Sequence, residues 1–175
     1  MKTRRSTGRW TRLAISSREL TTVLREPVEG ELEPVFSPLT SARFALGLET
    51  IYEGYLVHYG RPRLIEPADD DAALVLGDYF YAQGLARIAA LGEIDAVGDL
   101  SALISLCAQA RADRREGDGA AWAATAALMG QGRLDAAREA LRDLGDTLLL
   151  ERLARETAGD PAIDQALEAH ARLVG

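Results

Sequence analysis

The amino-acid sequence predicts an all-α protein, an antiparallel helical bundle. Of its 175 residues 47% are apolar and only 6% aromatic, and the apolar set is rich in Ala and Leu, which lose little rotamer freedom in a helix. No run of β-branched and aromatic residues alternates with period two, so we expect no sheet. Glycine and proline divide the chain into segments of helical length.

Charge separates the N-terminal end from the rest of the chain. Residues 1–25 hold seven Lys or Arg and one Glu, a charge of +6, which leaves −13 for residues 26–175 out of the total of −7. An acidic body argues against nucleic acid as a partner, because phosphate binding needs a basic face. We expect residues 1–15 to be a disordered basic tail, either solvated or in peripheral contact with an anionic membrane or a diphosphate. Residues 16–175 should form a single helical domain.

Three further features concern the compartment. Cys107 is the only cysteine, so the chain cannot form an intrachain disulfide, and its apolar neighbours predict a small core residue. The short apolar run Leu13-Ala14-Ile15 is too short for a secretory signal. No stretch is long and apolar enough to span a bilayer. We therefore expect a cytoplasmic protein.

Residues typical of helix starts and helix ends predict the element boundaries in the first half of the chain. A capping-box spacing predicts a helix over residues 16–25. Two prolines and a glycine make residues 26–36 a linker. Ser37-Pro38 supplies an N-cap and a proline in the first turn, so a long helix should begin there and end at Tyr59. Residues 60–67 form a loop because they contain glycine and two prolines.

The acidic triple Asp69-Asp70-Asp71 lies where the next helix must begin. Consecutive helical residues point about 100° apart, so these carboxylates cannot converge on one ion, and we interpret them as an N-cap with favourable dipole charges. This helix should end at Leu91. The remaining helices are expected over residues 94–113, 120–130, 134–143, 146–157 and 162–173.

A family resemblance rests on motifs in residues 44–112. Gly60-Arg61-Pro62 is followed, seventeen positions after Gly60, by Gly77-Asp78-Tyr79, and residues 48–58 have the sequence LETIYEGYLVH. This segment resembles the trans-polyprenyl diphosphate synthase family, in which a similar Leu-Glu-x-Ile helix ends in Leu-Val-His and a Gly-x-Pro loop leads into a Gly-Asp-Tyr helix. The resemblance implies a shortened isoprenoid-synthase-like fold.

The sequence departs from the family where the metal-binding residues belong. In catalytic members paired aspartates follow the Leu-Val-His at once, whereas here His58 is followed by Tyr59 and Gly60. The family's reaction ionises an allylic diphosphate, and carboxylates hold the Mg²⁺ that neutralises the leaving group. A weaker match in the C-terminal third places the second aspartate-rich motif on residues 156–160. Glu156 and Asp160 are therefore vestigial metal-site candidates.

The resemblance implies a non-catalytic subunit. Heterodimeric synthases of hexaprenyl and heptaprenyl diphosphate pair a short subunit lacking the motifs with a full-length catalytic subunit, which brings Mg²⁺ and supplies isoprenoid biosynthesis, commonly the menaquinone side chain. On this hypothesis the present chain binds no cofactor alone and has no catalytic residue. Two alternatives are a helical-repeat scaffold, because residues 121–137 resemble a tetratricopeptide helix pair, and an unassisted enzyme that uses Glu156 and Asp160.

The resemblance also predicts which residues form a partner interface and which line a prenyl pocket. The partner interface is expected at Asp78, Tyr79, Phe80, Tyr81 and Leu85, with plain core as the alternative. A prenyl pocket is expected at Ile51, Gly54 and Tyr55, with ordinary helix packing as the alternative.

The same helix carries two further polar features, the pair Glu49 and Glu53 and the single residue His58. Glu49 and Glu53 share a helix face, and two carboxylates make a poor Mg²⁺ site, so a solvated or interface face is expected. His58 is either a remnant of the lost motif or a satisfied, partly buried histidine, and we favour the second. The chain lacks a nucleophile motif such as Gly-x-Ser-x-Gly that would make His58 a catalytic base.

Overall fold

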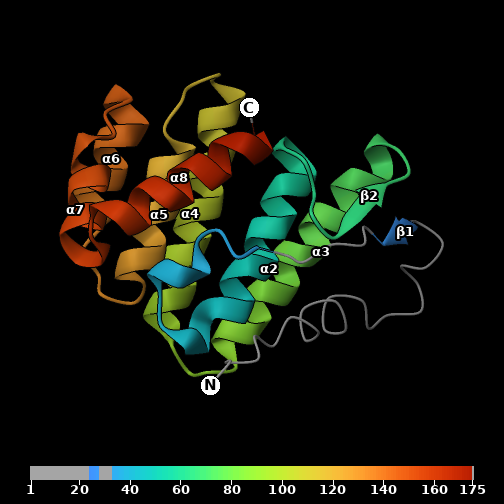
Figure 1. The fold of residues 1–175 in the computed structure, drawn as a ribbon, viewed down its shortest axis with the longest axis horizontal. Coiled ribbons are helices and arrows are strands. Elements are labelled where there is room, and N and C mark those ends of the chain that lie inside the picture. The colour runs from blue at the N-terminus through green and yellow to red at the C-terminus, as the bar shows by residue number, and fades with distance from the viewer. Residues whose placement is uncertain (1–23, 28–32, 175) are drawn as a thin grey trace.

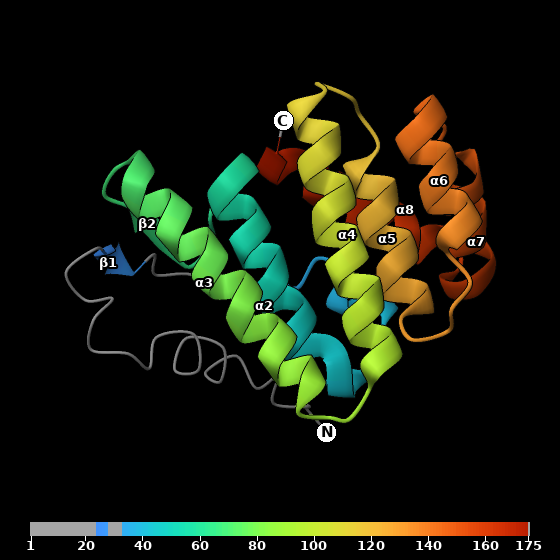
Figure 2. The same ribbon diagram turned by 180° about the vertical axis from the view of Figure 1, so that it is seen from behind.

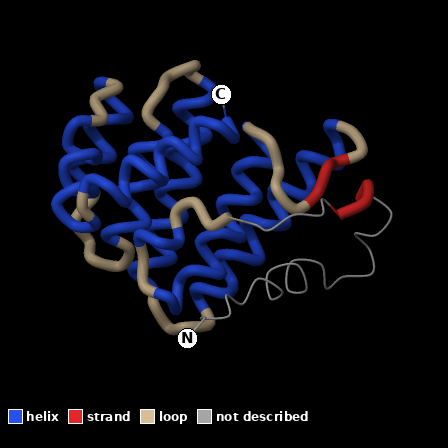
Figure 3. The backbone as a smooth tube through the Cα atoms, in the orientation of Figure 1, coloured by secondary structure: helices blue, strands red, loops and turns tan. Residues whose placement is uncertain are grey.

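The computed structural model describes residues 24–27 and 33–174, and over these ranges it is mostly helical, with loops and two short strands (Figures 1 and 3). The elements in chain order are β1 (Leu24–Pro27), the 3₁₀-helix η3 (Ser37–Leu39), α2 (Ala42–Tyr59), β2 (Ile65–Pro67), α3 (Asp70–Ala89), α4 (Ile94–Ala112), α5 (Asp118–Leu128), α6 (Asp135–Leu144), α7 (Leu148–Ala158) and α8 (Asp160–Val174).

The helices form two groups. Helices α2 and α3 lie side by side as an antiparallel pair, and α4 to α8 pack beside that pair (Figures 1 and 2). Helix α5 is the central element, since all its residues from Gly119 to Leu128 are buried. Its many alanines let α4, α7 and α8 pack around it closely.

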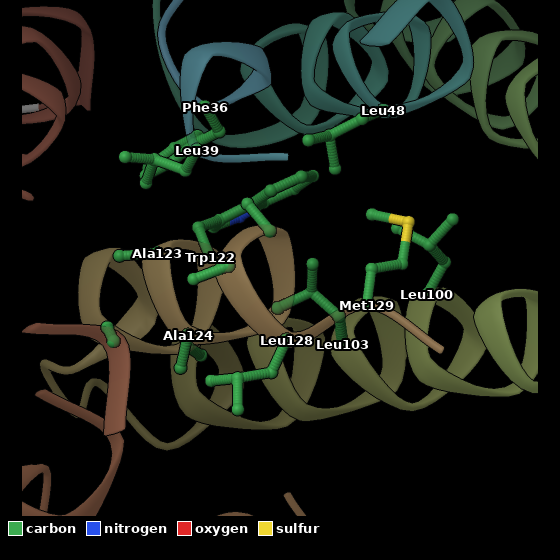
Figure 4. Packing of buried hydrophobic residues seen from close by; sticks show 14 of the residues in the cluster. Phe36, Leu39, Leu48, Leu100, Leu103, Trp122, Ala123, Ala124, Leu128 and Met129 are labelled. Carbon is green, nitrogen blue, oxygen red and sulfur yellow. The ribbon is translucent and has the colours of Figure 1, made fainter. Parts of the chain in front are cut away.

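Trp122 of α5 lies at the centre of the hydrophobic core (Figure 4). Its indole stacks on Phe36 with ring centroids 5.5 Å apart and meets Tyr52 of α2 edge-on at 5.0 Å. The same core cluster includes residues from every α-helix. A smaller cluster of Val57, Ile65, Leu76 and Phe80 lies between the ends of α2 and α3 and strand β2.

The predicted helix boundaries from residue 69 onward agree with the structure to within two residues. Asp69 is the N-cap of α3, as predicted, because its Oδ1 accepts a 2.8 Å hydrogen bond from the backbone N–H of Ala72. Helix α8 begins at Asp160, so that Pro161 lies in its first turn, where a missing N–H costs nothing. No helix in the described part of the chain has the length and apolar character needed to cross a membrane.

Two predictions about the N-terminal third are wrong. The expected helix from Ser37 to Tyr59 is interrupted, because Thr40 is extended between η3 and α2. The expectation of no sheet fails in a small way, since β1 pairs antiparallel with β2 and includes Leu24 and Arg25, which were assigned to a helix. The disordered tail expected over residues 1–15 and the helix expected over residues 16–23 lie outside the described residues.

Candidate functional site

Glycines set the distance between α2 and α3. Gly47 and Gly54 on α2 are seven residues apart, as are Gly77 and Gly84 on α3, so each pair shares a helix face. A Cβ atom on Gly54 would lie 2.8 Å from the carbonyl oxygen of Gly77, and one on Gly84 would lie 2.8 Å from that of Gly47. The two backbones are therefore in direct contact along what we call the glycine seam, Gly47, Gly54, Gly77 and Gly84.

The side of α3 opposite the glycine seam is exposed. We define the α3 outer face as Asp71, Leu74, Val75, Asp78 and Ala82, which fall on one side of the helix and are all solvent-exposed. Leu74 and Val75 are each 59% exposed, and the Asp78 side chain is 71% exposed. Leu74 and Val75 are adjacent, so they give this face an apolar centre with Asp71 and Asp78 on either side.

The expected partner-interface residues are divided between this face and the interior. Asp78 belongs to the α3 outer face, whereas Tyr79, Tyr81 and Leu85 are half-buried beside it. Phe80 is 1% exposed and belongs to the small cluster with Leu76, so its assignment to the interface is wrong. Three consecutive helical residues cannot all face a partner.

Sequence reasoning missed Leu74 and Val75. Their exposure depends on which side of α3 packs against α2. The seven-residue spacing of Gly77 and Gly84 was the feature of the sequence that indicates the packed side.

The carboxyl end of α2 is closed by packed side chains and by α8. His58 is the satisfied, partly buried histidine that we favoured: its side chain is 12% exposed, and its Nε2 lies 3.3 Å from Oδ1 of Asp78. A Cβ on Gly60 would lie 2.7 Å from the carbonyl oxygen of Leu173, and that oxygen accepts a 2.8 Å hydrogen bond from the N–H of Arg61. The end of α8 therefore covers the position that follows His58.

Glu156 and Asp160 do not approach this end of α2. A carboxylate oxygen of Glu156 lies 3.8 Å from a nitrogen of Arg152, and one of Asp160 lies 3.2 Å from a nitrogen of Arg155. Both carboxylates are on the surface. Asp160 begins α8 and Leu173 is close to its end, so about 20 Å of helix separates them at 1.5 Å per residue. Among the described residues no group of three or more His, Cys, Asp or Glu side chains could hold a metal ion.

The three residues expected to line a prenyl pocket are packed inside the molecule. Ile51 and Tyr55 have no exposed surface, and Ile51 packs against Gly84. Gly54 belongs to the glycine seam. This arrangement agrees with ordinary helix packing, the alternative that the sequence left open.

Glu49 and Glu53 are buried, so the expectation of a solvated or interface face is wrong. They are 4% and 0% exposed, and both bind Arg63, whose Nη1 lies 2.8 Å from Glu49 and whose Nε lies 3.0 Å from Glu53. Glu49 Oε1 also accepts hydrogen bonds of 2.9–3.0 Å from three backbone N–H groups at residues 35–37. The two carboxylates fasten the chain before η3 and the loop after α2 onto α2.

A second polar cluster, Tyr52, Tyr55, Arg111, Asp118 and His170, joins α2, α4, α5 and α8. Asp118 accepts hydrogen bonds from the Tyr55 hydroxyl and from Arg111, and Arg111 Nη2 donates to the Tyr55 oxygen at 2.8 Å. The Tyr52 hydroxyl lies 3.0 Å from Nδ1 of His170, whose Nε2 lies 3.7 Å from Asp118.

Three residues of this cluster, Arg111, Asp118 and His170, line a cleft of about 460 Å³ between α5, α7 and α8. The cleft is lined by both signs of charge, since Arg111 and Arg115 face the same space as Glu116, Asp118 and Glu151. It therefore favours neither an anion nor a cation. The other lining residues are Gly117, Gly119, Ala120, Thr147, Leu167, His170, Ala171 and Val174.

Asp118 should make the stability of the fold depend on pH. Burial raises the pKa of its carboxyl group, but the hydrogen bonds from His170 and Tyr55 and the charges of His170 and Arg111 lower this pKa well below its ordinary value. A carboxyl group with a lowered folded-state pKa adds stability that is complete above its unfolded pKa of about 3.9 and is lost as the pH falls below it. Asp118→Asn should therefore lower the free energy of unfolding at pH 7.

Urea unfolding of both proteins at several values between pH 7 and pH 3 would check this. The difference between wild type and the variant should shrink in acid. A difference that does not change with pH would show that the Asp118 charge contributes nothing.

Cys107 plays no part in either polar cluster. It is 1% exposed, and burial raises the pKa of its thiol. A buried neutral thiol is unreactive, so Cys107 is the small core residue that the sequence predicted.

Comparison of the chain with protein-family models, with curated proteins and with solved structures found no match. The α3 outer face and the covered end of α2 are the two features of the described structure that bear on function.

Proposed function

We propose that this protein is a non-catalytic subunit that binds a full-length trans-polyprenyl diphosphate synthase and supports its activity and product length. The catalytic partner would bring Mg²⁺, the allylic diphosphate and isopentenyl diphosphate. The product would serve isoprenoid biosynthesis, such as the menaquinone side chain.

The α3 outer face is the observation that carries the proposal. It lies within residues 44–112, the segment that resembles the synthase family. Leu74 and Val75 are each 59% exposed there, and the glycine seam fixes α3 in this orientation. A rigid helix with an exposed apolar centre and a polar surround is suited to contact another protein.

The end of α2 supports a role without catalysis. Tyr59 and Gly60 stand where the resemblance expects paired aspartates, and the backbone of α8 lies against Gly60. Ionisation of a diphosphate needs Mg²⁺ held by carboxylates. We therefore assign this chemistry to the partner.

No observation favours the two alternatives. A helical repeat contacts only its neighbours in the chain, whereas the end of α8 contacts Gly60 and Arg61 after α2. An unassisted enzyme would need Glu156 and Asp160 to act together at a metal, but each pairs with an arginine on the surface.

Addition of the purified protein to the full-length polyprenyl diphosphate synthase of the same organism should increase prenyl transfer or change product length. The double variant Leu74→Glu with Val75→Glu should abolish this effect, because it places charge at the apolar centre. Leu144→Glu with Leu148→Glu is the matched control, since these leucines are 80% and 73% exposed on α6 and α7. Unchanged rate and product length with the wild-type protein would disprove the proposed function.

A further inference from the structure

The α3 outer face combines apolar and acidic side chains in a fixed order. Asp71 and Asp78 are seven residues apart on one side of the helix, a separation of about 10 Å along its axis. Leu74 and Val75 lie between them. Both aspartates are solvent-exposed, and the Asp78 carboxylate also lies 3.3 Å from Nε2 of His58 on α2. Helix α2 holds α3 through backbone contact at the glycine seam, so these four side chains have a fixed spacing.

We propose that this face binds a helix of the catalytic partner that presents Lys or Arg side chains on both sides of an apolar centre. The inference rests on the proposed function and adds the chemistry of the recognised surface. The apolar centre would cover Leu74 and Val75, while basic groups about 10 Å apart would meet Asp71 and Asp78. Complementary charges of this kind fix the register of two helices and speed their encounter.

A second copy of this chain does not fit the same face. A symmetric dimer uses one patch on both subunits, so the patch must complement itself. The α3 outer face contains two aspartates and no basic residue, and residues 26–175 carry a charge of −13 in total, so two copies would bring like charges together. A basic partner removes that repulsion.

The affinity for the purified full-length synthase, measured by titration calorimetry at low and high salt, tests this inference. We expect Asp71→Asn with Asp78→Asn to raise Kd about tenfold at about 50 mM KCl, and the difference from wild type to shrink at about 500 mM, where charges are screened within a few ångströms. Glu139→Gln with Asp143→Asn is the matched control, because it removes two exposed carboxylates from α6 and so changes the net charge equally. The control should bind like wild type.

The outcomes separate the two proposals. If the wild-type protein does not bind the synthase, the proposed function and this inference both fail. If it binds but Kd is independent of salt, or if the α6 control weakens binding as much as the α3 variant, the proposed function survives and the charge-complementary partner helix is disproved. Stronger binding by the α3 variant would also disprove it.

Discussion

Replacement of Glu53 by alanine is expected to destabilise the fold by about 3–5 kcal/mol, the usual cost of leaving a buried ion pair without one partner. Glu53 has no exposed surface. Its Oε1 accepts hydrogen bonds from the N–H groups of Arg63 at 2.6 Å and Leu64 at 2.8 Å, and its Oε2 accepts one from Arg63 Nε at 3.0 Å. Alanine would leave three partly buried donors without this acceptor.

The free energy of unfolding from urea titration measures this loss. Glu168→Ala is the control, because Glu168 is an exposed glutamate of α8 and such surface changes usually stay within about 0.5 kcal/mol. Glu53→Gln should fall between the two, since an amide keeps one acceptor oxygen. A loss below about 1 kcal/mol for Glu53→Ala would contradict the importance of a buried polar anchor between α2 and the following loop.

The sequence could not reveal that Glu49 and Glu53 are buried. Two carboxylates four residues apart have the pattern of an exposed helix face, and carboxylates are seldom buried unless paired. Their partner, Arg63, lies beyond a turn, and the backbone N–H groups that bind Glu49 belong to residues 35–37. Only the folded chain brings these groups together.

Helix boundaries were predictable because their signals are local. Asp69 caps α3 through a residue three positions away, and Gly92 follows the α3 helix with a positive φ of 77°. The cluster of Tyr52, Asp118 and His170 has no such signal. Tyr52 and His170 are 118 residues apart, and no spacing rule connects them. The same holds for the end of α8 against Gly60.

Gly77 has a packing role that is independent of any family resemblance. Gly77 lies on the glycine seam, where a Cβ would collide with the His58 ring. The seven-residue spacing of glycines on both helices was present in the sequence, and it indicates close antiparallel packing of two helices. Gly54, assigned from the resemblance to a prenyl pocket, is explained by the same spacing.

Gly54→Ala should therefore destabilise the protein, although alanine is the better helix former. At an unconstrained helical site this change stabilises by about 1 kcal/mol. At Gly54 the new methyl group would lie 2.8 Å from the carbonyl oxygen of Gly77 and 3.0 Å from Cβ of Phe80, so α2 and α3 must move apart. Overpacking of this kind costs about 1–3 kcal/mol, and we expect a net loss in this range because the obstructing atom belongs to the backbone.

Gly98→Ala provides a control of opposite sign. Gly98 lies within α4, and a Cβ added there has no atom within 4 Å, so only the helix preference acts and the free energy of unfolding should rise by up to about 1 kcal/mol. Chemical unfolding of both variants would therefore distinguish the cost of steric overlap at the glycine seam from the gain in helix propensity. If Gly54→Ala were as stabilising as Gly98→Ala, α2 and α3 would not be held in backbone contact, and the fixed orientation of the α3 outer face would lose its physical basis.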